Sequence, residues 1–229
     1  MKRIPYHLGI IVDGNRRWAK KNKLPLIEGH RRGFEKVKEL GKWCKDKGVK
    51  ILTLFAFSTE NWKRPGNEVH YLMKLIGLSL SRNNIQDIYK DGIKIKIIGQ
   101  REKLTPGLQK TIEQAEELTR HNKDGILNIA LSYGGKAEIV EAIKRIVGRK
   151  VPPEKLNEKL IDENLWTAGE PHPDLIIRTG GEQRLSNFLI WQAAYSELYF
   201  SKKYWPDFTE KDLDEVFDDY GSRQRRFGK

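Results

Sequence analysis

The chain has 229 residues, of which 32% are charged and 38% are hydrophobic, enough for one folded domain spanning residues 1–229. Its net charge of +12 favours an anionic partner: a phosphorylated small molecule, a polyanion or an anionic membrane surface. The single cysteine, Cys44, excludes an intrachain disulfide and a cysteine-rich metal site. Without a signal peptide or an apolar run of roughly 20 residues, we expect a cytoplasmic protein whose membrane contact, if any, is peripheral.

Short apolar runs alternate with helical patterns along the chain. The runs predicted as strands are 8–12, 51–57, 93–97, 126–131, 175–177 and 198–200. The patterns predicted as helices are 34–44, 67–90, 108–118, 139–147 and one that begins after Thr209. This alternation favours an α/β fold with a central, mostly parallel sheet of about six strands, flanked by helices. Ligand sites are then expected at the carboxyl ends of the strands.

The first predicted strand leads into Asp13, Gly14 and a predicted helix start that carries Arg16 and Arg17. Helix N–H groups, a glycine and guanidinium groups all suit a diphosphate, and Asp13 can hold Mg²⁺ against phosphate oxygens. A surface turn with solvated arginines is an equally good interpretation of this segment alone.

The second predicted strand ends in a polar cluster, residues 58–65. Ser58 and Asn61 could orient a reacting group, Arg64 could bind phosphate, and Trp62 could contact an apolar tail. Taken alone, Asn61 is more often a turn residue than a catalytic one.

The third cluster follows the strand at 175–177 and places Arg178 and Arg184 on either side of a glycine turn. With Ser186 they could bind one diphosphate; the less favoured alternative is an arginine network that ties the loop to acidic neighbours. Three loops at strand ends thus offer arginines, Asp, Asn and Ser but almost no nucleophile. This combination favours the binding of two phosphorylated groups, and no common nucleotide-binding motif is present.

Four segments together resemble the signatures of the cis-prenyltransferase (undecaprenyl diphosphate synthase) family. These segments are 7–19, 57–65, 132–135 and 173–189, and the terminal Trp205-Pro206 and residues 226–228 also fit. The resemblance implies a homodimeric α/β enzyme that elongates an allylic diphosphate, farnesyl or geranylgeranyl, with isopentenyl diphosphate in cis. It also implies Mg²⁺ as cofactor, a medium-length polyprenyl diphosphate as product and no nucleic acid partner.

The resemblance also assigns roles to individual residues. Asp13 and Asn61 are implied to be catalytic, with Asp13 and Glu197 near the metal. Arg178, Arg184 and Ser186 are implied to bind isopentenyl diphosphate. The residues implied to surround the allylic substrate are Gly14, Asn15, Arg16, Arg17, Trp18, His30, Ser58, Trp62 and Arg64. Arg226 and Gly228 match a tail motif that reaches toward the partner's site.

The chain departs from the family pattern at two positions. Leu26 stands where the family usually has an arginine for the allylic diphosphate, and Gln183 stands where bacterial relatives often have histidine. We hypothesise that Arg16 substitutes for the missing arginine. The small side chain of Ala56, on the second strand, is expected to leave room for a prenyl chain, beside Leu54 and the helix predicted over 67–90.

Three other functions are open from the sequence. Prenyl transfer to a different acceptor is kept open by Leu26, and a catalytically silent partner subunit would need the same fold. A basic RNA-binding protein would use arginines on phosphates and aromatic residues for stacking. It would bind RNA in a salt-dependent manner and turn over no diphosphate.

Overall fold

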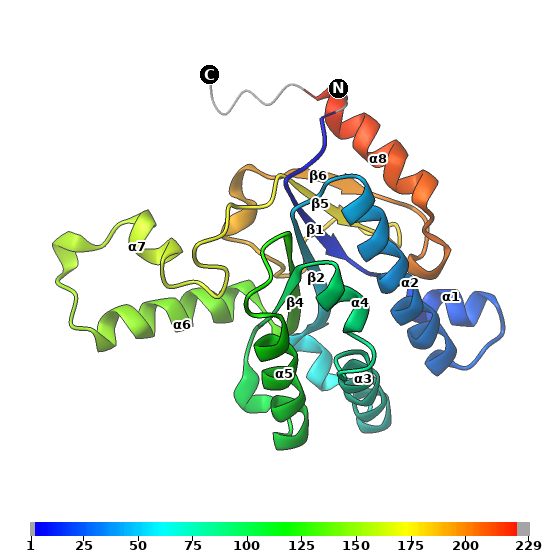
Figure 1. The fold of residues 1–229 in the computed structure, drawn as a ribbon, viewed down its shortest axis with the longest axis horizontal. Helices are drawn as coiled ribbons and strands as arrows, with labels where there is room; N and C mark the ends of the chain where they lie inside the picture. The colour runs from blue at the N-terminus through cyan, green and yellow to red at the C-terminus, as the bar shows by residue number, and fades with distance from the viewer. Residues whose placement is uncertain (1–2, 224–229) are drawn as a thin grey trace.

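The computed structural model describes residues 3–223 and contains a six-stranded sheet in the order β3-β4-β2-β1-β5-β6 (Figure 1). Every neighbouring pair of strands is parallel, so all six carboxyl ends lie at one edge of the sheet. The strands are β1 (His7–Ile11), β2 (Ile51–Ser58), β3 (Ile93–Ile98), β4 (Gly125–Tyr133), β5 (Leu175–Arg178) and β6 (Glu197–Phe200). The predicted α/β class and all six predicted strands are confirmed, including the edge position of β3.

Within the described residues, seven α-helices connect these strands and an eighth follows β6. They are α1 (Asn15–Lys21), α2 (Leu26–Asp46), α3 (Gly66–Ser79), α4 (Gln86–Lys90), α5 (Pro106–Thr119), α6 (Gly135–Gly148), α7 (Glu158–Asp162) and α8 (Glu210–Ser222). The N-terminal signal predicted for the last helix is confirmed: the side chain of Thr209 accepts a hydrogen bond from the Asp212 N–H, and Asp212 bonds back to Thr209. Figure 1 shows α6 and α7 projecting from one side of the sheet and the α1–α2 connection from the other.

One face of the sheet carries the larger apolar core. Alternate residues such as Leu8 and Ile10 of β1 point to this face and pack with Leu40 of α2 and Phe217 of α8. The same face continues over β3 and β4, where α3 and α5 supply a second cluster around Ile112. α2 belongs to the first cluster and α3 to the second, and the two helices contact each other. Both contribute residues to the wall of an apolar cavity described below.

The opposite face contains a buried polar network. His7 Nδ1 donates to the Pro171 carbonyl at 2.7 Å, and its Nε2 accepts from the Thr53 hydroxyl at 2.7 Å. Thr53 also accepts from the Asn128 amide at 3.2 Å, and Asn128 donates to Glu170, which pairs with Lys96. These bonds satisfy polar groups that would otherwise be costly to bury, and they tie β1, β2, β4 and β3 together.

The prediction of one long helix over 67–90 is wrong. The helix stops at Ser79, and α4 begins only at Gln86. The cause is local: the Ser81 hydroxyl and the Asn84 amide both donate to the Leu78 carbonyl, at 2.8 and 2.6 Å. Short polar side chains that bond to the backbone in this way compete with helical hydrogen bonds.

Candidate active site

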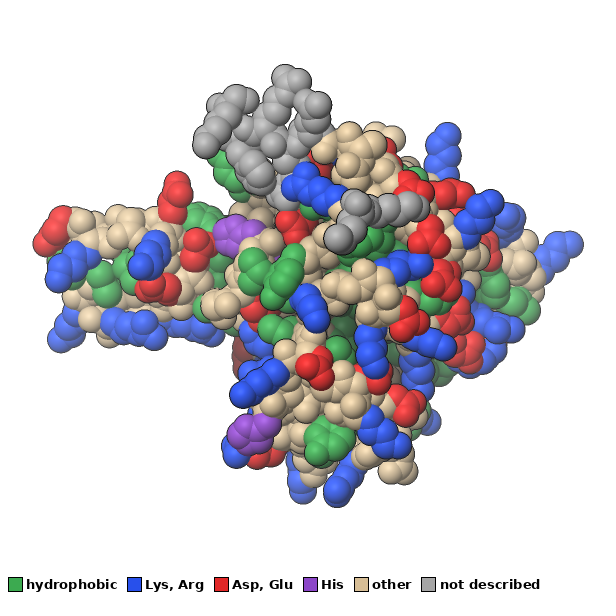
Figure 2. Space-filling view, turned by 45° about the horizontal axis from the view of Figure 1, so that its top comes forward, with side chains coloured by type: hydrophobic (Ala, Val, Ile, Leu, Met, Phe, Trp, Pro, Cys, Tyr) green, Lys and Arg blue, Asp and Glu red, His purple; other side chains and the backbone are tan. Residues whose placement is uncertain are grey.

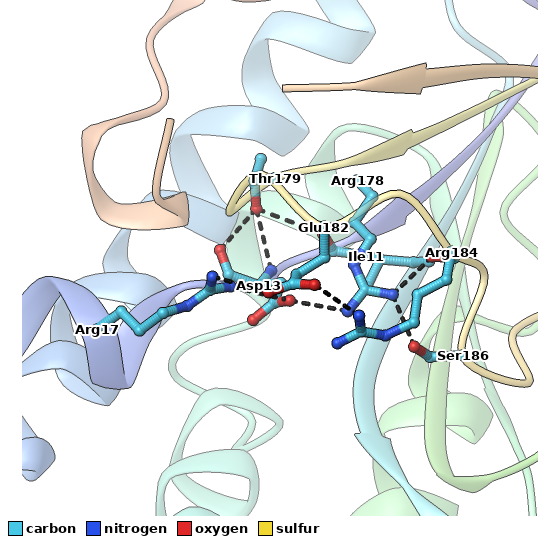
Figure 3. Close-up of polar contacts among 8 residues, drawn as sticks. All are labelled: Ile11, Asp13, Arg17, Arg178, Thr179, Glu182, Arg184 and Ser186. Atoms are coloured by element: carbon cyan, nitrogen blue, oxygen red, sulfur yellow. Dashed lines mark hydrogen bonds and ion pairs between the residues drawn. The ribbon is translucent and has the colours of Figure 1, made fainter. Parts of the chain in front are cut away.

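A cluster of charged groups lies where β1 and β5 end (Figure 3). These strands are neighbours, with Ile11 opposite Arg178, so Asp13 comes to lie beside Arg178. The Arg178 guanidinium donates to Asp13 Oδ2 at 2.8 Å and to the Ser186 hydroxyl at 2.6 Å. Arg17, from the first turn of α1, lies 3.3 Å from the same Asp13 oxygen. One carboxylate thus lies between two guanidinium groups.

The Asp13 carboxyl is held ionised by these arginines. Partial burial alone would raise its pKa, but the hydrogen bond and charge of Arg178, with the charge of Arg17, outweigh burial and lower the pKa below its usual value. The Thr179 hydroxyl bonds to both the N–H and the carbonyl of Asp13, at 3.0 and 2.8 Å. Asp13 is therefore a fixed negative charge around neutral pH.

Two glycines allow the segment after β1 to lie close to the segments after β5 and β6. Gly180 has φ of +89°, and a Cβ there would lie 2.7 Å from an Arg17 nitrogen. Gly14 has φ of +107°, and a Cβ there would lie 2.8 Å from the Tyr204 ring. Both positions favour glycine because their backbone is left-handed. At Gly14 the contact with the Tyr204 ring also excludes a side chain, whereas at Gly180 the flexible Arg17 side chain could move.

Asn187, in the loop after β5, connects that loop to the loops after β4 and β2. Its carbonyl accepts from the Gly135 N–H at 2.7 Å, its side-chain oxygen accepts from the Lys136 N–H at 2.9 Å, and its amide donates to Glu60 at 3.2 Å. The loops after β5, β4 and β2 are thus bonded to one another through a single residue, so the rim of the site forms one connected unit.

A second charged cluster is centred on Glu68 of α3, which is 8% exposed. Its Oε1 accepts from His30 Nε2 at 3.1 Å and from Arg64 at 3.2 Å, and Arg16 Nε lies 3.8 Å away. Three basic residues from α1, α2 and the loop after β2 thus meet at one buried carboxylate. The sequence interpretation did not include Glu68; its position four residues after Arg64 is the spacing of a helical ion pair and was the available signal.

His30 in this cluster is neutral near pH 7. Burial lowers its pKa, and the hydrogen bond to Glu68 only partly reverses the effect. Because a carboxylate faces Nε2, this nitrogen carries the proton. His30 is therefore a hydrogen-bond donor fixed in one orientation.

Both clusters open into one cavity of about 2020 Å³. Below the polar rim its walls are mainly apolar and include Leu54 and Ala56 of β2, with Leu72 and Ile76 of α3. The cavity continues along α2 to Lys45 and Asp91, which are 2.5 Å apart. Since β2 has eight residues at roughly 3.3 Å each, the cavity has the height of the sheet, about 26 Å. A polar head and a long apolar tail fit this shape.

The comparisons with known proteins agree on one family. The family model described as "Putative undecaprenyl diphosphate synthase" matches residues 11–228. The chain is 47% identical to an isoprenyl transferase of Chromobacterium violaceum, with 98% of this chain and 88% of the relative covered. It is 44% identical to a farnesyl-diphosphate-specific ditrans,polycis-undecaprenyl-diphosphate synthase of Legionella pneumophila, with 99% and 97% covered. The chain belongs to the undecaprenyl diphosphate synthase family.

Solved structures of this family share the fold. Lavandulyl diphosphate synthase from Lavandula x intermedia, in complex with dimethylallyl diphosphate, gives a TM-score of 0.94 at 37% identity, with 98% of each chain covered. A probable undecaprenyl diphosphate synthase from Campylobacter jejuni gives 0.82 at 33% identity, with 99% of this chain and 100% of that chain covered. The chain is accordingly a prenyltransferase, as the resemblance implied.

Most of the residues expected from the family resemblance lie around this cavity. Its lining includes twelve of them: Asp13, Gly14, Asn15, Arg16, Arg17, His30, Ser58, Asn61, Arg64, Arg178, Arg184 and Ser186. The side chain of Asn61 accepts from the Ser58 N–H at 3.1 Å, so it also shapes its own loop. The sequence analysis did not identify Thr179, which positions Asp13, because its only signal was its place directly after Arg178.

Three expected residues lie elsewhere in the described structure. The Trp18 indole donates to Asp207 at 2.6 Å, and the Trp62 indole donates to Ser132 at 2.9 Å and packs on Phe57; neither lines the cavity. Glu197 begins β6 opposite Leu175, at the amino end of the sheet, and pairs with Arg223. Within one chain Glu197 and Asp13 are therefore at opposite ends of their strands. Arg226 and Gly228 lie outside the described residues.

Proposed function

We propose that this enzyme transfers an allylic prenyl group to isopentenyl diphosphate by repeated cis condensations, releasing pyrophosphate and giving a medium-length polyprenyl diphosphate. The observation that carries the proposal is the pairing of two arginine clusters, around Asp13 and Glu68, with one long apolar cavity. Two diphosphates can lie side by side at the rim while one apolar chain extends into the cavity.

The basic residues of the two clusters divide between the two diphosphates in the proposed reaction. Arg178, Ser186 and Arg184 bind the isopentenyl diphosphate, while Arg17, Arg16 and the N-terminal N–H groups of α1 receive the allylic diphosphate. The allylic C–O bond breaks with its electron pair leaving on the diphosphate, and guanidinium groups offset that charge. The isopentenyl double bond attacks the allylic carbon, and a proton then leaves the isopentenyl unit to Asp13 or to a diphosphate oxygen.

The donor groups at the rim fit Mg²⁺. Mg²⁺ is usually bound by one or two carboxylates together with substrate phosphates, so Asp13 alone can supply the protein ligand. This agrees with the described residues, which contain no cluster of three acidic, histidine or cysteine ligands. When bound, Mg²⁺ neutralises charge on the departing diphosphate. Glu197 could join such a site only from a second chain, which keeps it a prediction.

We assign the active form as a homodimer with no nucleic acid partner, in the cytoplasm or at the membrane surface. Val140, Ile143 and Val147 are exposed on α6 and follow one another at spacings of three and four residues, so they form an apolar stripe on one helix face. Such a stripe could pack against a second copy of the chain. None of the helices in residues 3–223 is both long and apolar enough to cross a membrane.

RNA binding is disfavoured by the placement of the arginines. Arg178 is 5% exposed and hydrogen-bonded within the site, so it cannot reach an extended polyanion. On the face drawn in Figure 2, Lys and Arg side chains are interspersed with Asp and Glu rather than gathered in one basic patch.

The test is incorporation of radiolabelled isopentenyl diphosphate with Mg²⁺ and farnesyl or geranylgeranyl diphosphate in turn. We expect a ladder of butanol-soluble products, and none from Asp13→Ala. Dimethylallyl diphosphate is tested as a third primer, because the lavandulyl diphosphate synthase of similar fold was solved in complex with it. Folded protein that incorporates no isopentenyl unit with any primer would disprove the proposed acceptor.

A further inference from the structure

The connection between α1 and α2 and the first turn of α2 together expose three neighbouring apolar side chains. Leu24 is 42% exposed, Leu26 is 40% exposed and Ile27 is 45% exposed. They lie within four consecutive residues together with Pro25, at the part of the molecule that projects beyond α1 in Figure 1. Single exposed leucines are ordinary on protein surfaces, but a contiguous apolar tip usually marks an interaction site.

The backbone holds this tip in a defined shape. Leu24 N–H donates to the Ala19 carbonyl at 2.9 Å, and Lys23 N–H donates to the Lys20 carbonyl at 3.1 Å, which closes the end of α1. Lys23 has φ of +57° at the position where such helix ends usually have glycine. A lysine in this strained conformation places a charged side chain next to Leu24, where glycine would place none.

Cationic groups surround the apolar tip. Lys20, Lys21 and Lys23 are exposed, and none of them forms an ion pair within residues 3–223. On the α2 side the charges are balanced, because Arg31 pairs with Glu28 at 2.8 Å and with Glu35 at 2.5 Å. The three lysines therefore give this tip a net positive charge next to its apolar side chains.

The tip also borders the substrate cavity. Lys20, Leu24 and Leu26 belong to the same cavity lining as Asp13 and His30, whereas Ile27 does not. A surface that covered the tip would therefore lie against the mouth through which an apolar chain enters or leaves.

We infer that residues 20–27 form a docking surface for an anionic lipid bilayer, with Leu24, Leu26 and Ile27 in the interface and the lysines on lipid headgroups. Apolar side chains beside unpaired lysines are the combination that binds such surfaces, each lysine adding to the attraction. A protein partner would need no such combination. That the bilayer receives the prenyl product rests on the proposed function, but the docking does not.

A fluorescent label tests the contact directly. Ile27→Cys is labelled with a polarity-sensitive maleimide dye, and Leu156→Cys, an equally apolar position 52% exposed on another part of the surface, is the control. The native Cys44 does not interfere, because it is buried and its thiol pKa is raised to about 12. With phosphatidylglycerol vesicles we expect a blue shift at position 27 and none at position 156.

The label also distinguishes the proposed bilayer contact from two alternatives. A blue shift at position 27 that grows with protein concentration without lipid would show that a second copy covers the tip, which overturns the inference. Vesicle binding without any shift at position 27 would place the bilayer on another surface and would overturn it as well.

Binding to vesicles gives the energetic test. Lys21→Gln with Lys23→Gln should weaken partitioning into anionic vesicles by roughly 25-fold, about fivefold for each lysine. The matched control, Lys110→Gln with Lys123→Gln, removes the same charge from exposed positions elsewhere and should weaken partitioning far less. Equal losses would mean that only net charge matters and would overturn the inference.

Activity in solution keeps this test separate from the proposed function. Ile27→Gln should bind anionic vesicles about fivefold more weakly while its turnover of short, water-soluble diphosphates without lipid is unchanged. An inactive wild type that still docks through position 27 would remove the proposed function and leave the docking surface intact.

Discussion

At the scale of single residues, carboxylates organise the basic groups of the site. Glu68 is the clearest case, since His30 and Arg64 both donate to its Oε1 while Arg16 lies near. A buried carboxylate with cationic partners on three elements determines where those partners point before any substrate is present. Glu68 is therefore a positioning residue rather than a catalytic one.

The variant Glu68→Gln tests this role. We expect the KM for the allylic diphosphate to rise about tenfold or more with a smaller change in kcat, because the amide keeps the shape but not the charge. Glu68→Asp should recover part of the loss. Steady-state kinetics with each substrate varied in turn distinguish this from a general loss of folding, which would reduce kcat for both substrates alike.

Arg16 gives a second prediction at this scale. It lies at the cavity rim, and Leu26 stands where the family resemblance implies an arginine. If Arg16 substitutes for that arginine, Arg16→Gly raises the KM for the allylic substrate about tenfold and leaves the KM for isopentenyl diphosphate unchanged. An unchanged allylic KM would contradict the substitution.

Buried histidines predict a pH dependence of stability. Burial lowers the pKa of His7 and of His30 in the folded protein, while both have pKa values near 6.5 when unfolded. The unfolded chain therefore binds protons first, and the free energy of unfolding falls as the pH decreases below about 6.5. Urea unfolding at pH 7 and pH 5 measures the fall. His7→Gln should reduce this difference.

At the scale of elements, the contact between α1 and α2 depends on missing side chains. A Cβ on Gly29 would lie 2.2 Å from the Asn15 carbonyl oxygen, and a Cβ on Gly33 would lie 2.5 Å from the Asn15 side chain. The helix that carries Arg16 and Arg17 can therefore approach α2 only where α2 has glycine.

Alanine scanning of α2 glycines tests this packing. Gly29→Ala should lower the free energy of unfolding by about 1 to 3 kcal/mol and reduce activity, since α1 must move. Gly41→Ala on the same helix meets nothing within 4 Å and should stabilise the protein by about 0.5 to 1 kcal/mol. Denaturant unfolding of both variants is the measurement, and equal effects would argue against close packing as the cause.

The second element-scale prediction concerns β2. Ala56 lies in the cavity wall between the polar rim and the apolar interior. Ala56→Leu should therefore obstruct the cavity and shift the product distribution to shorter chains, read by chromatography of the dephosphorylated products. An unchanged distribution would mean that the growing chain does not pass this wall.

At the scale of the whole molecule, the sequence was sufficient for the sheet and for the rim of the site. Apolar runs identified all six strands, and polar clusters after β1, β2 and β5 meet because parallel strands end at one edge. Glu68 and Thr179 were missed because they act through other residues and carry no motif. The break between α3 and α4 was missed because apolar periodicity continues through it while Ser81 and Asn84 cap the Leu78 carbonyl.

Assembly provides the prediction at this scale. Val147, on the stripe of α6, is 68% exposed. If the proposed homodimer forms through this stripe, Val147→Glu should shift it to monomer in light scattering, because a charge would be buried in the contact. Glu154→Gln, at an exposed position outside the stripe, is the control. A dimer that persists in Val147→Glu would place the subunit contact elsewhere.

The ion pairs of the rim have a consequence for selectivity in a phosphate-rich cell. Arg178 and Arg17 pair with Asp13, Arg184 pairs with Glu182, and Arg64 pairs with Glu68, so these guanidinium groups already have anionic partners within the protein. An incoming anion must compete with those carboxylates. Inorganic phosphate offers little to offset that competition, whereas a diphosphate with a prenyl tail gains contacts at the rim and along the cavity at once. The acidic residues thus act as an internal competitor that free phosphate has to overcome.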